Sequence, residues 1–250
     1  MEEGLDFIQQ GNITKAIAAF RASIDLNPDL APAHYNLGLA LRQEGQLQSS
    51  ANAFYQALRI DPDFAYAYAS LGAALMEGGN FPQAIEYLNR SIEIDPTIGI
   101  GYYNLGLIYF QQQQIPAAIE KFQLSRRYSP NAPESSYYLG LIYFNQGNFD
   151  KAQKNLETAI EISPRYPEAY YQLGLVFLRQ NKSQLALESL RTAIEVNPYY
   201  ADAYYVAGMI YLQHNYRAEA LPLLDYAQKV YAAEGKEAWA NGVANILSQM

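Results

Sequence analysis

The residues that could do chemistry in this chain are few, and none of them is spaced for catalysis. There are two histidines, His34 and His214, and no cysteine, which excludes disulfides, thiolate metal sites and a cysteine nucleophile. Neither histidine has a second histidine or a carboxylate cluster at metal-ligand spacing. No phosphate-binding glycine loop, nucleophile elbow or zinc pattern occurs. The sequence therefore predicts a protein with no catalytic residues, no cofactor and no metal site.

Tyrosine is the side chain that remains to be explained, because the chain has 23 of them in 250 residues. A tyrosine ring carries about 150–250 Å² of surface together with a hydroxyl group that can donate and accept. Such a side chain suits a core, and it equally suits a contact with another molecule. Which role applies to each tyrosine depends on the element that carries it.

Those elements follow a repeat of 34 residues. Glycine recurs at this interval at Gly4, Gly38, Gly72, Gly106, Gly140, Gly174 and Gly208. Proline recurs at Pro28, Pro62, Pro96, Pro130, Pro164 and Pro198. Alanine recurs at Ala16, Ala84, Ala118, Ala152, Ala186 and Ala220, with Ser50 in the same place in the second repeat. Three series in one register predict a tandem array of similar units.

Each unit contains two helical patterns, as residues 167–200 illustrate. The first has apolar residues at helical spacing at Tyr170, Leu173, Gly174 and Phe177. The second has Ala186, Leu190, Ala193 and Ile194, and it ends at Pro198 because proline cannot continue a helix. The break between the helices is a glycine in most repeats, and Gln113, Asn181 and Asn215 replace it in three. We expect the recurrent glycine and alanine to lie where the two helices cross, since a larger side chain would hold the backbones apart.

These motifs resemble the tetratricopeptide repeat (TPR) family along nearly the whole chain. The resemblance implies an all-α fold, a TPR-type α-solenoid in which antiparallel helix pairs form a right-handed superhelix. It divides a single domain, residues 1–250, into repeats 1–30, 31–64, 65–98, 99–132, 133–166, 167–200 and 201–234, with a capping helix at 235–250. Ala232 replaces the seventh proline, so we expect the last hairpin to run more continuously, and we expect Pro222 to bend it. Trp239 is expected to pack on the last repeat.

In the TPR family, one face of each first helix lines the concave surface and commonly holds a ligand. At its fifth, sixth and ninth positions this chain has Tyr35, Asn36, Leu39, Tyr103, Asn104, Leu107, Tyr137, Leu141, Tyr171, Gln172, Leu175, Tyr205 and Met209. We call these residues the tyrosine face. Two interpretations stay open: a stripe of tyrosines packed between repeats, or a groove that binds a peptide.

The charges on this face restrict the peptide that it could hold. Chaperone-binding TPR domains clamp a terminal carboxylate with lysine and arginine, but tyrosine stands here at Tyr103 and Tyr137, where a clamp lysine would be. Glu134, Glu168 and Asp202 occupy the second position of the last three full repeats. An apolar, aromatic or mildly basic peptide is therefore a better candidate than an acidic tail.

We predict a non-catalytic scaffold that binds a protein or peptide partner. A net charge of −8 makes nucleic acid an unsuitable partner. A mean hydropathy of −0.20, no long apolar run and no signal peptide predict a cytoplasmic protein without membrane insertion. Two alternatives stay open: the substrate-recruiting arm of a larger enzyme such as a glycosyltransferase, since the first repeat begins within a helix, or a homo-oligomer that associates through its tyrosines.

Overall fold

The computed structural model describes every residue from Met1 to Met250 and consists of α-helices without strands, which confirms the predicted fold class. The first helices of the repeats are α1 (Glu2–Gln9), α3 (Ala31–Gln43), α5 (Ala65–Glu77), α7 (Gly99–Gln111), α9 (Glu134–Asn145), α11 (Pro167–Arg179) and α13 (Ala201–Gln213). The second helices are α2 (Ile13–Leu26), α4 (Leu47–Ile60), α6 (Phe81–Ile94), α8 (Ile115–Tyr128), α10 (Phe149–Ile162), α12 (Ser183–Val196) and α14 (Arg217–Ala233). A last helix, α15 (Glu237–Ser248), follows them.

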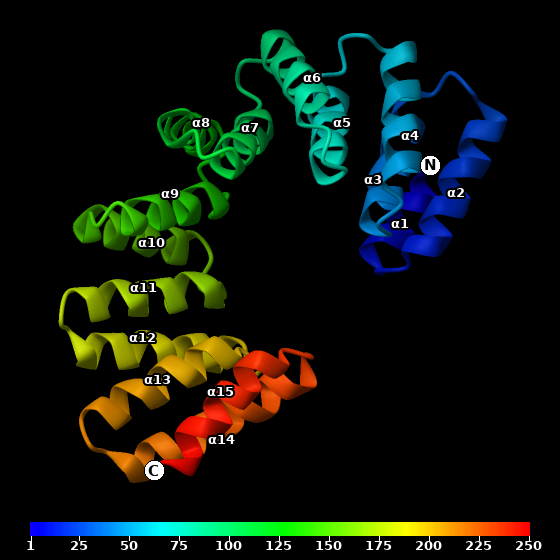
Figure 1. Ribbon diagram of the computed structural model, residues 1–250. Coiled ribbons are helices and arrows are strands. Elements are labelled where there is room, and N and C mark those ends of the chain that lie inside the picture. Colours follow the sequence, from blue (N-terminus) through cyan, green and yellow to red (C-terminus); the bar gives the residue numbers. More distant parts are fainter. The chain divides into compact units, whose positions relative to one another are not determined.

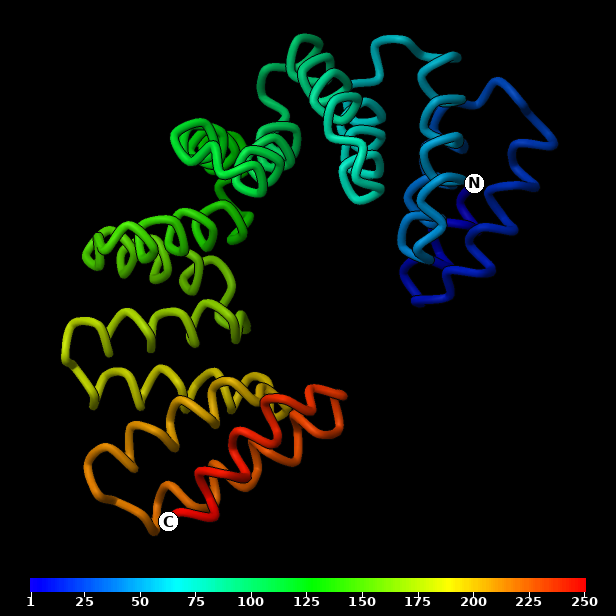
Figure 2. Tube along the Cα trace, in the orientation of Figure 1, coloured from blue at the N-terminus to red at the C-terminus, as the bar shows by residue number.

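The helices form two compact units, residues 1–130 and 131–250, which we call unit 1 and unit 2. Unit 1 contains α1 to α8, and unit 2 contains α9 to α15. Within each unit, consecutive helices pack side by side and the chain reverses direction at every connection (Figures 1 and 2). A single solenoid domain over the whole chain stays a prediction.

The recurrent glycines lie at the helix crossings, as predicted from their spacing. A Cβ atom added to Gly106 in α7 would lie 2.7 Å from Cε1 of Phe122 in α8. In unit 2, a Cβ atom on Gly208 in α13 would lie 2.7 Å from Cγ of Leu224 in α14. Contacts this short do not occur in well-packed cores, so the glycines let the two helices of a repeat approach closely. Gly242 in α15 differs from these glycines, since nothing lies within 4 Å of a Cβ atom added to it.

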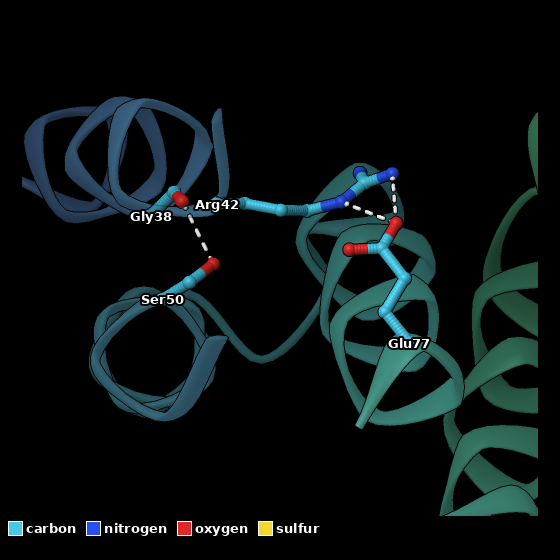
Figure 3. Close-up of polar contacts among 4 residues, drawn as sticks. All are labelled: Gly38, Arg42, Ser50 and Glu77. Carbon is cyan, nitrogen blue, oxygen red and sulfur yellow. Dashed lines mark hydrogen bonds and ion pairs between the residues drawn. The ribbon is translucent and has the colours of Figure 1, made fainter. Parts of the chain in front are cut away.

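Ser50, which replaces the recurrent alanine in the second repeat, also lies at a crossing. Its side chain is fully buried, and its hydroxyl donates a hydrogen bond of 2.8 Å to the carbonyl oxygen of Gly38 (Figure 3). A buried hydroxyl without a partner would cost about 1–3 kcal/mol. Serine therefore fits this place because a backbone carbonyl of the partner helix accepts a hydrogen bond from its hydroxyl.

The turns and the last hairpin also follow the sequence predictions. Gln113, Asn181 and Asn215 have φ angles of 61°, 58° and 61°, the left-handed conformation of the glycines that they replace. The helix α14 has 17 residues where α12 has 14, in accord with the absence of the seventh proline. Pro222 lies inside α14, and a bend at this residue stays a prediction. None of the helices is at once long and apolar enough to cross a bilayer.

Candidate functional site on the tyrosine face

Three of the tyrosines at the fifth position pack against an aromatic residue that ends the same repeat. Ring centroids lie 4.9 Å apart for Tyr35 and Phe64, and 5.2 Å apart for Tyr171 and Tyr200. Tyr137 packs in the same way on Tyr166, at 5.1 Å. The sequence has these partners at the last position of three repeats, but helical spacing within the first helices does not single them out. Because each ring is half-buried, the two interpretations combine: part of the ring packs between helices and part faces solvent.

In unit 1 the tyrosine face is interrupted by small residues on α5. Ala69 and Ala73 stand at the fifth and ninth positions of α5, with exposed fractions of 1% and 2%. Asn104 on α7 is 3% exposed, and its Nδ2 has no hydrogen-bond partner. A ligand could reach this amide only after a local rearrangement. Asn36, the other asparagine predicted to hold a ligand, is half-buried.

An ion pair ties two repeats together at the end of the same helices in unit 1. Arg42 at the end of α3 donates from Nε and Nη2 to Oε1 of Glu77 at the end of α5, over 2.9 and 2.7 Å (Figure 3). Both side chains keep about a third of their surface exposed, at 34% and 35%. The pair uses the positive charge of Arg42 within the protein, so this arginine is not a free cation for an acidic ligand.

In unit 2 the tyrosines gather around Asp202, in the first turn of α13. The hydroxyl of Tyr231, on α14, donates a hydrogen bond of 2.6 Å to Oδ1 of Asp202. Tyr231 is 1% exposed, and burial raises the pKa of its phenol, as do the hydrogen bond to Asp202 and its charge. Trp239 of α15 lies beside this tyrosine, with ring centroids 5.9 Å apart, and beside Tyr205 at 6.4 Å. The predicted packing of Trp239 on the last repeat is present, although 56% of the side chain stays exposed.

The tyrosines of unit 2 are held in their neutral form. Burial, and then the charge of Glu168, raises the pKa of Tyr137 to about 12. Burial, and then the charge of Asp202, raises the pKa of Tyr171 to about 12. Burial is also the largest cause that raises the pKa of Tyr200. Near neutral pH these phenols therefore keep their protons and can donate hydrogen bonds.

A hollow of about 440 Å³ lies between α11 and α13, on the tyrosine face of unit 2. Its lining is mainly apolar and consists of Leu178, Tyr205, Val206, Met209, Ile210, Leu212 and Gln213. Tyr205 and Met209 are predicted site residues, whereas the other lining residues were not among those predicted, although Val206 stands at the sixth position, which the prediction uses in other repeats. Tyr137, Leu141, Tyr171, Gln172 and Leu175 lie outside this hollow, at the same repeat positions on α9 and α11. Helical spacing alone places these residues on one face, but only packing determines where that face is hollow.

No group of three or more His, Asp or Glu side chains in the structure could hold a metal ion. The chemistry available on this face is therefore apolar contact, stacking and hydrogen bonding by phenols and amides. Contacts of these kinds are typical of protein surfaces that recognise another chain.

Comparison with protein families gives matches along most of the chain. Models described as tetratricopeptide repeat match residues 1–63, 41–98 and 167–200. A model described as TPR repeat matches residues 106–147 and 140–181. No curated protein matches the sequence.

Solved structures with the same arrangement of helices are numerous. A chain of the APC/C hetero-tetramer Cut9–Hcn1 is 17% identical over 98% of this chain and 47% of its own length, with a TM-score of 0.78. MamA is 28% identical over 65% of this chain and 95% of its own, with a TM-score of 0.56. YrrB, described as a TPR protein with an unusual peptide-binding site, is 23% identical over 75% of this chain and 97% of its own, with a TM-score of 0.55.

Proposed function

The chain belongs to the tetratricopeptide repeat family, and we propose that it is a non-catalytic scaffold whose unit 2 binds a segment of a partner protein on its tyrosine face. The TPR fold is in general a support for protein interactions. The observation that carries the proposal is the hollow of about 440 Å³ between α11 and α13. It combines a mainly apolar lining with the phenol of Tyr205 and the amide of Gln213.

The lining favours a peptide that inserts apolar or aromatic side chains. Leu178, Met209 and Leu212 supply apolar surface, and its burial against a ligand stabilises a complex by about 25 cal/mol per Å². The phenol of Tyr205 and the amide of Gln213 supply hydrogen bonds that would fix the orientation of the ligand. Packed helices are about 8–10 Å apart and an extended chain rises about 3.3 Å per residue. A peptide would therefore need about three residues to cross one helix.

The charges near this face favour a neutral or mildly basic segment. Glu168 and Asp202 stand at the second position of α11 and α13, and Glu134 has the same position in α9. No lysine or arginine lines the hollow. An acidic tail would meet these carboxylates without a cation to pair with, so we propose that such tails are rejected. The description of YrrB supports a peptide as the ligand only at the level of the shared fold.

We assign the residues of unit 1 to a separate contact surface. It consists of Tyr35, Asn36, Leu39, Tyr103, Asn104 and Leu107, of which Asn104 is buried. Because α5 has alanine at the fifth and ninth positions, this surface offers a ligand fewer aromatic and polar groups than that of unit 2. We propose that it contributes less to the affinity for the partner. We place the protein in the cytoplasm and propose no cofactor for it.

Capture of partners from the source lysate, followed by peptide binding, tests the proposal. Wild-type protein and a Tyr205→Ala, Met209→Ala double variant are immobilised in parallel, and captured proteins are identified by mass spectrometry. Overlapping peptides of a captured partner are then titrated by fluorescence anisotropy. We expect the double variant to bind the active peptide at least about tenfold more weakly, which corresponds to about 1.4 kcal/mol.

The matched control is Tyr199→Ala, which removes a tyrosine that is 70% exposed next to the start of α13. This variant should bind as the wild type does, and circular dichroism should show equal helicity in all three proteins. Equal binding by the double variant and the wild type would contradict the assignment of the hollow. Self-association measured by light scattering would instead favour a second copy as the partner.

A further inference from the structure

A second and larger hollow lies on a different face of α13, where α12, α13 and α14 meet. Its volume is about 590 Å³. It is lined by Ser183, Gln184, Leu187, Glu188, Arg191, Ile194, Tyr204, Ala207, Ile210, Tyr211, His214, Tyr216 and Leu223. The lining includes neither Tyr205 nor Met209, and Ile210 is the one residue that it shares with the hollow on the tyrosine face.

One substitution in the repeat contributes to this hollow. The seventh position of each first helix is leucine in five repeats, Leu37, Leu71, Leu105, Leu139 and Leu173, and all five are buried. Leu173 shows what this side chain does, since it belongs to the same core cluster as Ala152 and Leu156 of the preceding helix α10. The seventh repeat has Ala207 at this position, and Ala207 lines the hollow beside α12. The missing isobutyl group leaves apolar surface without its usual packing partner, which is unfavourable unless something else fills the space.

The lining has the composition of a small-molecule site. Its floor is aliphatic, with Leu187, Ile194, Ile210 and Leu223, and its walls are the rings of Tyr204, Tyr211 and Tyr216. Ligand pockets typically measure about 300–1,000 Å³ and combine such apolar surfaces with a few polar groups. A volume of about 590 Å³ exceeds what one missing leucine side chain would occupy and suits a fused or linked pair of rings.

Polar groups line two parts of the hollow. At one end, Nε2 of His214 lies 3.4 Å from the hydroxyl oxygen of Ser183, so the end of α13 and the start of α12 meet there. Arg191 stands further along α12. Glu188, the one carboxylate in the lining, accepts a hydrogen bond of 3.2 Å from the amide of Gln184. These side chains can form hydrogen bonds with a ligand whose main contacts are apolar.

We propose that the hollow between α12, α13 and α14 is a binding site for a small apolar molecule with aromatic rings. The site is independent of the peptide-binding surface proposed above. A ligand there would contact three helices of the last two repeats at once and would hold them together.

Two fluorescent probes of matched shape test this site in the full chain. The probes are 1-anilinonaphthalene-8-sulfonate and N-phenyl-1-naphthylamine, which has the same rings without the sulfonate. We expect both probes to bind wild type saturably, with one site per chain. Binding without saturation would overturn the proposal.

The decisive variant is Ala207→Leu, which restores the residue of the other repeats and fills the floor. It should weaken both probes at least about tenfold while the protein keeps its helicity. Met209→Ala is the matched control on the same helix, since it changes the other hollow and should leave probe binding unchanged.

A second variant keeps the test decisive if Ala207→Leu does not fold. Gln184→Trp places a large ring at the exposed mouth, on the surface of α12, and should weaken both probes by a similar factor. Folded variants that bind the probes as wild type does would overturn the proposal. A dimer in sedimentation velocity that Ala207→Leu abolishes would also overturn it, because a second copy of the chain would then fill the hollow.

Discussion

Units 1 and 2 share one framework and differ at the positions that the framework leaves free. In both units the recurrent glycine lies against a large side chain at the same repeat position, with Gly38 on Phe54 in unit 1 and Gly208 on Leu224 in unit 2. At the fifth position, however, unit 1 has one alanine between two tyrosines, whereas unit 2 has tyrosine in all three repeats. The residues at the helix crossings determine the fold. The positions that do not pack at a crossing determine which surface each unit presents.

The surfaces that result have different chemistry. In unit 1, the tyrosine face has buried alanines on α5 and the buried amide of Asn104 on α7. An ion pair between Arg42 and Glu77 joins α3 to α5. In unit 2, phenols surround Asp202, and hollows open on two faces of α13. The comparison therefore assigns ligand binding mainly to unit 2, and the following experiments test each part of it.

The largest effect is expected from removing one core ring or side chain in either unit. Phe122→Ala should lower the free energy of unfolding by about 3–5 kcal/mol, and Leu190→Ala by about 2–5 kcal/mol, because each leaves a cavity at a crossing where the side chain is fully buried. Amide hydrogen exchange should show the loss of protection for Phe122→Ala mainly in α7 and α8. For Leu190→Ala it should appear mainly in α11 and α12. Equal losses throughout the chain would contradict the division into two compact units.

A smaller effect separates a packed glycine from an unpacked one. Gly106→Ala should destabilise unit 1 by about 1–3 kcal/mol, because the new methyl group would overlap the ring of Phe122. Gly242→Ala should stabilise α15 by about 0.5–1 kcal/mol, since alanine favours a helix and nothing lies near the added Cβ. Urea unfolding of both variants measures the two values. A destabilised Gly242→Ala variant would mean that another surface covers this face of α15.

The tyrosines of unit 2 predict a loss of stability at high pH. Tyr171 has a pKa of about 12 in the folded protein against 10.0 for a free phenol, so the unfolded chain releases this proton first. Stability is then fully present below pH 10, falls as pH rises from about 10 to about 12, and changes no further above that range on account of this group. Unfolding of wild type and Tyr171→Phe at several pH values measures this slope. The variant should have a shallower slope, and an identical slope would mean that Tyr171 is not buried.

The smallest effect concerns the ion pair of unit 1. Arg42→Ala, Glu77→Ala and the double variant form a cycle that should give a coupling of roughly 0.2–1 kcal/mol, because both side chains are partly exposed to solvent. The coupling should decrease at high salt. A coupling that salt does not affect would contradict an ionic contact at this place.

Much of the fold could be predicted from the sequence, because the signals are local or strictly periodic. Helix breaks at Pro62 and Pro96, and left-handed turns at Asn181 and Asn215, depend on the backbone of one or two residues. The glycine crossings depend on residue size at a fixed interval, so their spacing alone located them. The substitution of leucine by Ala207 is also visible in the sequence, but its consequence is not.

The candidate site depends on distances that the sequence does not contain. Tyr171 meets Tyr200, and Tyr231 meets Asp202, across about a repeat of intervening chain. Asn104 is buried, although its position in the repeat predicts an exposed amide. The sequence by itself determined the repeat, the helix pairs and the residues that could form a binding face. Only the tertiary structure decided which of these residues are buried, which have charged neighbours and which line a hollow. Burial and electrostatics depend on every nearby atom and not on position along the chain.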